Sequence, residues 1–340
     1  MVYQNKNGDD KGQPYVPPHI IKYCRDNPLW LPLSLKNNIK GVQSVNMIFK
    51  NVVLILLLGL SVNASSAIVG WIDDFEGEPN NYSLIRGEQP LPVEFFTPLQ
   101  NGDKVKALHT QHRIILKFGD ETRIEVTQKN SPYIVKQVGQ VPSKFDHLLT
   151  WVGEWLTIWY RKEKETAIQI SIKGDADVPP YIKMLTVPKY SEQKIQVTIG
   201  TKPLYLAWAS GTPPYDVEIK RDQETLVQLS GLPTWRIHTL KCLLLQRGDY
   251  RVILSDAKHE PVEYIFTVVA NKPLYPPELQ NANLPELTRL TLQAAWLASQ
   301  DRGIWAFEAY QSVAPIAQYY QPARILRDTL EKGRLVVEPK

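Results

Sequence analysis

The amino-acid sequence predicts a mainly β protein with a smaller helical part. Short apolar or alternating runs, separated by turn-forming residues, fill residues 68–141 and return in residues 166–270. Helical periodicity is confined to residues 143–165 and 273–340. We therefore expect two β domains joined by an amphipathic helix and followed by a small helical segment.

An apolar run before the first β domain has the form of a secretory signal peptide. Lys50 precedes about ten apolar residues between Val52 and Val62, and small residues follow, with cleavage expected after Ala64 or Ala67. A membrane helix needs about 20 apolar residues, so the run is short for one. Residues 47–67 are therefore predicted to be a signal peptide, and the chain after it is predicted to be exported to the periplasm or cell surface.

Residues 1–46 are polar, rich in Asn, Lys and Pro, and lack the periodicity that buries a core, so they are predicted to be disordered if translated. One interpretation is that Met47 is the true initiator and that the preceding residues are not translated. The other is a cytoplasmic tail, with Lys36, Lys40 and Lys50 on the inner side of an uncleaved membrane anchor. The sequence alone leaves both interpretations open.

The net charge of +4 comes mainly from the start of the chain. Seven of the 39 basic residues and three of the 35 acidic residues fall in residues 1–50, which leaves 32 of each for the rest. Proteins that bind nucleic acid usually show a basic excess, because neutralising phosphates dominates their affinity. We therefore expect no nucleic-acid partner.

The first β domain is predicted to consist of short strands separated by turns. Turn formers stand at Asn101-Gly102-Asp103, Gly119-Asp120 and Asn130-Ser131-Pro132. Residues 118–122 are expected to make a tight hairpin between two strands. The predicted strands are 84–86, 104–108, 113–118, 123–126 and 133–135.

Several short motifs follow one another along this domain. They are Val69-Gly70, Arg86-Gly87, Asn101-Gly102-Asp103, the apolar run 114–118 and the alternating run 123–126. Their order resembles that of the FecR-like domain of bacterial envelope proteins. The chain departs from the pattern in having Gly119-Asp120 in place of Asp-Gly, and residues 108–112 in place of a Thr-Gly-Ser stretch. The resemblance covers about 70 residues; it implies a β-solenoid-like or sandwich module that binds proteins or wall material, and it implies no chemistry.

Residues 143–165 are predicted to form an amphipathic helix of about 17 residues. Trp151, Trp155 and Trp159 recur four residues apart and therefore share one face. This tryptophan stripe is the candidate binding surface of the chain. We expect it to pack between domains; peripheral contact with a membrane and binding of a glycan or peptide are the alternatives.

The second β domain resembles an immunoglobulin-like sandwich. Residues 168–172, 195–199, 215–219 and 250–254 alternate between apolar and polar and are predicted strands. Trp208 precedes a Gly and Pro-Pro turn, and Gly248-Asp249-Tyr250 resembles a late strand whose Tyr hydroxyl bonds back to a loop. The resemblance implies a core built around Trp208, Tyr250 and Phe266.

The C-terminal segment, residues 273–340, is predicted to be helical. Pro285 opens a helix over 286–299, and residues 301–303 turn the chain. Pro315 interrupts a second helix, and a third spans 324–332 before Gly333. One such unit cannot bury its own apolar face, so we expect it to dock on the second β domain.

The sequence shows no catalytic motif. His109 and His112 are the only close histidine pair, and on a strand they would point to opposite faces. Asp73, Asp74 and two nearby glutamates are interpreted as an exposed acidic loop. No nucleophile elbow, phosphate-binding loop or paired-cysteine motif occurs. We expect no catalytic residue, no metal and no cofactor.

These observations favour a non-catalytic exported envelope protein that binds or scaffolds protein or cell-wall partners through β modules. The alternative is a membrane-anchored FecR-like signal transducer, an anti-sigma-type regulator with residues 1–46 in the cytoplasm. The sequence specifies neither the ligand nor the oligomeric state.

Overall fold

The computed structural model describes residues 67–136, 146–169, 177–186, 194–239, 242–280 and 284–334, with side chains of the first long helix described as far as Arg161. The prediction of a mainly β protein is confirmed for this part of the chain, which contains five β-sheets and a smaller number of helices. The predicted signal peptide and residues 1–46 lie outside the described residues.

The first β module, residues 67–136, consists of two four-stranded sheets with strand orders β4-β1-β6-β7 and β3-β2-β5-β8. Alternation in β5 directs Val105 and Ala107 into the core and the two lysines outward. The predicted hairpin between β6 and β7 is confirmed, with Ile114 opposite Val126. The strands are β1 (Ile68–Phe75), β2 (Tyr82–Arg86), β3 (Gln89–Leu91), β4 (Pro98–Gln100), β5 (Lys104–Ala107), β6 (Ile114–Phe118), β7 (Arg123–Val126) and β8 (Tyr133–Ile134).

The long helix α2 spans Asp146–Gln169 and is longer than predicted. Ile168 and Gln169, which we expected to begin a strand, belong to this helix. The helix continues because residues 162–167 contain strong helix formers and neither Gly nor Pro. The rest of that predicted strand, residues 170–172, lies outside the described residues.

The second β module, residues 194–269, has a five-stranded sheet of order β13-β12-β16-β17-β9 and two two-stranded ladders, β10-β15 and β11-β14. The β17-β9 pair is parallel, and the other pairs are antiparallel. The strands are β9 (Ile195–Thr198), β10 (Gly200–Lys202), β11 (Tyr205–Ala207), β12 (Tyr215–Arg221), β13 (Glu224–Leu232), β14 (Arg236–His238), β15 (Leu243–Leu245), β16 (Gly248–Ser255) and β17 (Val262–Val269).

The core of the second β module contains the aromatic residues expected from the sequence. Trp208, Tyr250 and Phe266 are all buried, and the Tyr250 and Phe266 rings stack with centroids 5.3 Å apart. The Tyr250 hydroxyl accepts a hydrogen bond from the backbone N–H of Gln246 at 2.9 Å, so the predicted bond from this tyrosine back to a loop is confirmed. The same core extends into the helices, because Phe266 also meets Phe307 edge to face.

Three further helices follow: α3 (Glu286–Ser299), α4 (Ala306–Val313) and α5 (Gln321–Glu331). The predicted bounds of α3 are confirmed. The chain turns after α3 at Asp301 and Arg302, both of which have positive φ. Seven of the eight residues of α4 are buried, because this helix is covered by the second β module as well as by its neighbours α3 and α5.

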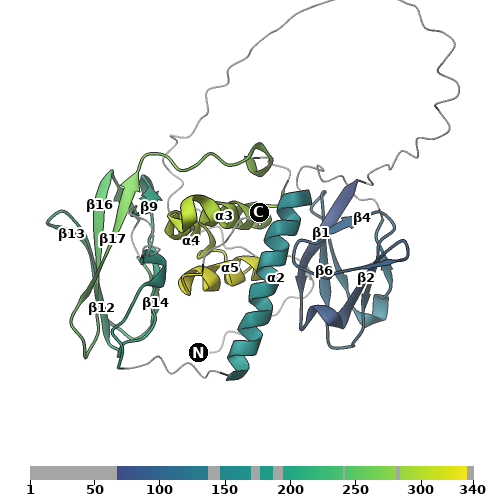
Figure 1. Ribbon diagram of the computed structural model, residues 1–340, viewed down its shortest axis with the longest axis horizontal. Coiled ribbons are helices and arrows are strands. Elements are labelled where there is room, and N and C mark those ends of the chain that lie inside the picture. Colours follow the sequence, from purple (N-terminus) through teal and green to yellow (C-terminus); the bar gives the residue numbers. More distant parts are fainter. Residues whose placement is uncertain are drawn as a thin grey trace, which may run out of the picture.

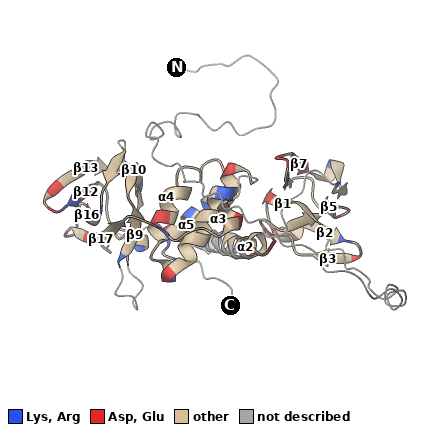
Figure 2. Ribbon diagram, turned by 90° about the horizontal axis from the view of Figure 1, so that it is seen from above, with Lys and Arg blue, Asp and Glu red and all other residues tan. Residues whose placement is uncertain are grey.

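Helices α2 to α5, which we call the helical layer, lie between the two β modules (Figure 1). Helix α2 lies next to the first module, and α4 lies next to the second (Figure 1). The view from above shows the same order (Figure 2). None of the described helices has the length and apolar character needed to cross a membrane.

Candidate functional site

The tryptophan stripe of α2 faces the other helices of the helical layer. Trp151 is only 7% exposed, and Trp155 and Trp159 are half-buried against the core. The Trp155 and Trp159 rings meet edge to face at 6.2 Å, and the Arg334 guanidinium lies 4.2 Å above the Trp159 ring. Trp151 is therefore covered, whereas Trp155 and Trp159 stay partly exposed. Binding through the stripe stays a prediction.

The predicted exposed acidic loop is wrong for Asp73 and Asp74, whereas Glu76 is exposed just after the end of β1. Asp73 and Asp74 lie on strand β1, and Asp73 is only 8% exposed. The strand was missed because both of its faces are buried and mostly apolar, which removes the alternation that marks a half-exposed strand. One side of β1 packs in the module, and helix α5 contacts the strand from outside the module.

Asp73 joins the first β module to the helical layer. Its Oδ1 accepts a hydrogen bond from the Tyr320 hydroxyl at 2.7 Å and another from the Trp71 indole at 3.2 Å. Tyr320 directly precedes α5, and its hydroxyl is 3.2 Å from that of Thr288 on α3. This chain of contacts links strand β1, helix α3 and the start of helix α5 in a buried interface.

Burial raises the pKa of the Asp73 carboxyl above its ordinary value, although the Tyr320 and Trp71 hydrogen bonds and the charges of Lys117 and Arg123 oppose that shift. Burial and the charge of Asp73 raise the pKa of Asp74 to about 7, against the opposing effects of the Phe75 N–H and of Arg324 and Arg113. These groups are on β1, β6, β7 and α5, in the loop before β6 and, for Tyr320, at the residue just before α5. The interface therefore takes up protons more readily than the unfolded chain does.

The sign of the resulting pH dependence follows from linkage. The folded protein binds the Asp74 proton more tightly than the unfolded chain, so the free energy of unfolding should rise as pH falls from about 8 to about 4, by up to about 1.4 kcal/mol per pH unit. Asp74→Asn, which keeps an acceptor for the Phe75 N–H, should raise the melting temperature at pH 8 and flatten this pH dependence. Urea unfolding of the parent protein and the variant at several pH values measures this change in unfolding free energy. An unchanged pH profile in the variant would contradict the assignment.

Glu308 of α4 joins the helical layer to the second β module. It is 6% exposed, and its carboxylate accepts hydrogen bonds from the Thr198 N–H at 3.1 Å, the Thr198 hydroxyl at 2.6 Å and the Lys202 ammonium at 2.7 Å. The backbone N–H of Gln196 donates to the Ile304 carbonyl at 3.0 Å. Strand β9 is an edge strand of its sheet, and these contacts cover that edge.

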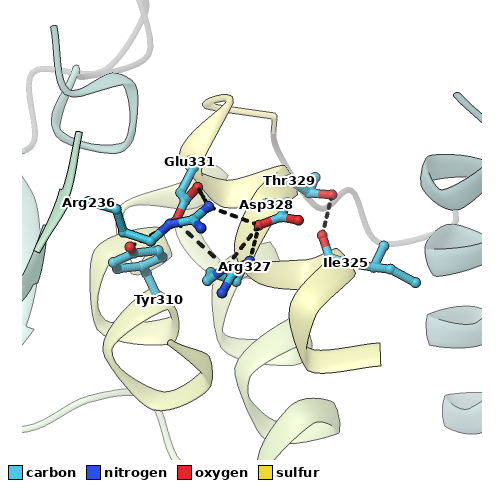
Figure 3. A network of polar contacts seen from close by, with 7 residues as sticks. All are labelled: Arg236, Tyr310, Ile325, Arg327, Asp328, Thr329 and Glu331. Atoms are coloured by element: carbon cyan, nitrogen blue, oxygen red, sulfur yellow. Dashed lines mark hydrogen bonds and ion pairs between the residues drawn. The ribbon is translucent and has the colours of Figure 1, made fainter. Parts of the chain in front are cut away.

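A second set of polar contacts connects β14 with α5 (Figure 3). Arg236 donates to Glu331 at 2.9 and 2.5 Å and to Asp328 at 3.2 Å. The Tyr310 hydroxyl also donates to Glu331, at 2.9 Å. Forked pairing of a guanidinium with a carboxylate fixes direction as well as distance, so this network sets the orientation of α5 against the second module.

The histidines in the described part of the chain form no common site. His109 and His112 lie in the turn between β5 and β6 rather than on a strand, with ring centroids 5.9 Å apart. His259 pairs with Asp256, with 2.9 Å between Nδ1 and Oδ2, and His238 stacks on Tyr205. Among the described residues no group of His, Cys, Asp and Glu is arranged to hold a metal ion.

Comparison with known proteins finds no family model that matches this chain and no similar curated protein.

The polar residues at the interfaces of the helical layer were not predicted from the sequence. Glu308 is separated from its partners by 106 and 110 residues, and Tyr320 is separated from Asp73 by 247 residues. No local pattern connects positions so far apart; the only available signal was a single charged residue, Glu308, in an otherwise uncharged helix.

Proposed function

We propose that this protein is a non-catalytic, exported protein of the bacterial envelope that binds or scaffolds protein or cell-wall partners through its two β modules. The observation that carries the proposal is the pair of buried polar contacts that hold both modules on one helical layer: Asp73 with Tyr320, and Glu308 with Lys202. A partner that touches both modules would meet them already ordered, which lowers the entropic cost of binding.

An exposed tryptophan on the second module supports a binding role. Trp235 is 49% exposed, and the Arg236 guanidinium lies 4.3 Å from the centre of its ring. Arg236 is itself held by Glu331, so the indole has a supported position. Tryptophans of this kind contribute strongly to protein interfaces, because they bury a large apolar area with little loss of rotamer freedom.

We further propose the two finer fold assignments made from the sequence. An immunoglobulin-like sandwich is supported by the buried Trp208 and by the Tyr250 hydroxyl bond to Gln246. A FecR-like first module is supported by the order of its turns and by the 118–122 hairpin. Neither fold specifies a ligand, because ligand choice depends on particular loops.

A binding experiment tests the function. Purified full-length protein is mixed with isolated peptidoglycan and, separately, with detergent-solubilised envelope proteins followed by crosslinking. We expect saturable binding in one of these mixtures, weakened at least about tenfold by Trp235→Ala. Leu244→Ala, at another exposed apolar residue of the same module, is the matched control and should bind normally. Absence of saturable binding in both mixtures, or turnover of a wall substrate, would contradict the proposal.

N-terminal sequencing separates the proposed function from the anchored alternative. A mature protein that begins at Ser65 or Ile68 supports export with cleavage. Retention of Met1 or Met47 in the membrane fraction would instead favour the signal transducer, in which Lys36 and Lys40 lie on the cytoplasmic side.

A further inference from the structure

A proline-rich segment crosses the surface between β17 and α3 (Figure 1). It contains Pro273, Pro276 and Pro277, and residues 271–276 belong to neither a helix nor a strand. A short 3-10 helix, η5 (Pro277–Gln280), follows it. Because proline fixes φ near −65° and lacks an N–H, such a segment favours the polyproline II conformation.

The exposure of side chains along this segment repeats every three residues. Asn271, Leu274 and Pro277 are exposed, whereas Lys272, Tyr275 and Glu278 are half-buried. A polyproline II helix has three residues per turn, so residues three apart share an edge. Asn271 and Leu274 therefore lie on the outward edge of residues 271–276, and Lys272 and Tyr275 lie on the edge that faces the protein. Pro277, the first residue of η5, is also exposed.

Leu274 is the most exposed large hydrophobic side chain in the described part of the chain, at 89%. Its neighbour Tyr275 attaches the segment to helix α3. The Lys272 ammonium donates to the Tyr275 hydroxyl at 2.9 Å, and the Tyr275 ring packs edge to face on Trp296 of α3 at 5.5 Å. The Gln280 side chain donates to the Tyr275 carbonyl at 2.6 Å. The anchor thus holds the segment extended while Leu274 points away from the core.

We propose that residues 272–278 are a docking segment for a partner protein whose aromatic-lined groove recognises polyproline II. Such grooves bind Pro-x-x-Pro segments, and here two adjacent pairs, Pro273-Leu274 and Pro276-Pro277, flank the anchored Tyr275. The partner gains apolar contact with Leu274 and with the prolines. Little conformational entropy is lost on binding, because the prolines and the anchor already restrict the segment.

This docking segment does not include Trp235, and its recognition rests on residues 272–278 alone. We name a protein domain as the partner because a groove lined by aromatic rings provides the concave surface that an exposed proline-rich edge fits. Self-association through Leu274 is one of the outcomes that the test distinguishes.

Purified SH3 and WW domains, which carry such grooves, are the probes for the test. Each domain of a panel is titrated by interferometry against the immobilised full-length protein and against a synthetic peptide of residues 270–280. We expect at least one domain to bind the full-length protein, at least about threefold more tightly than it binds the peptide, because the protein holds the segment extended. Leu274→Asp and Pro276→Ala should each weaken binding at least about tenfold.

The matched control is Leu244→Asp, at an exposed leucine on strand β15 of the second β module, which should leave binding unchanged. Leu274 is too exposed for its substitution to disturb the core, so loss of binding in Leu274→Asp reports on the segment. Three outcomes would overturn the inference: no domain binds, binding survives Leu274→Asp, or the full-length protein self-associates through Leu274.

Discussion

Glu308→Ala should cost about 3–5 kcal/mol of unfolding free energy, because it breaks a buried ion pair and leaves the other charge without its partner. The Lys202 side chain is 21% exposed, and its ammonium would lose its carboxylate partner. The N–H and hydroxyl of Thr198 would lose their acceptor. The damage falls where α4 covers the edge strand β9, so the second β module and the helical layer should loosen together.

An exposed ion pair in the same module provides the control. Lys194 and Asp249 are 2.5 Å apart, but both side chains are about half exposed, at 51% and 48%. Water replaces a lost partner at such a site, so Asp249→Ala should cost at most about 1 kcal/mol. Urea unfolding of the two variants and the parent protein gives both values. Similar losses in the two variants would show that Glu308 has no special role.

Gly153→Leu should separate α2 from the first β module. A Cβ atom at position 153 would lie 1.7 Å from the Phe95 carbonyl oxygen, so a side chain there requires the backbone of α2 or of the Phe95 loop to move. One turn further along, the Thr157 hydroxyl accepts a hydrogen bond from the Phe95 N–H at 3.0 Å, which fixes the same approach. We expect a loss of about 3 kcal/mol or more, at the upper end for overpacked sites.

Gly153→Ala makes the same test with the smallest side chain. In an exposed helix, replacing Gly by Ala stabilises by about 1 kcal/mol, so a destabilised Gly153→Ala protein would report the close contact and not helix propensity. Ile158→Ala, on an exposed position of the same helix, should change the unfolding free energy little. A Gly153→Ala protein more stable than the parent would contradict the packing of α2 on Phe95.

The sequence predicted the elements whose patterns are local. The run 123–126 alternates and is strand β7, and Pro285 and the turn at Asp301-Arg302 mark both ends of helix α3. Strand β1 was missed because it is buried on both faces, so it carries no alternation. The strand expected to start at Ile168 became helix because local helix propensity continued through that position.

The candidate site could be predicted much less well, because its contacts join distant parts of the chain. Asp73 looked like part of a solvated acidic loop, and only the docking of Tyr320 from the C-terminal helices buries it. Arg236 and Glu331 lie in segments that the sequence treats as separate domains, yet they form a forked pair. Trp151 was recognised from the sequence, but its neighbours in the helical layer could not be known from its spacing.

The central claim is that the helical layer joins the two β modules into one folding unit. Native-state hydrogen exchange in low concentrations of urea, followed by mass spectrometry, tests it most directly. We predict that peptides from β6, α4 and β16 exchange through one shared opening, with the same unfolding free energy and the same dependence on urea. Exchange of β6 through a separate opening of lower free energy, while α4 and β16 stay protected, would contradict the claim and show that the first module unfolds independently.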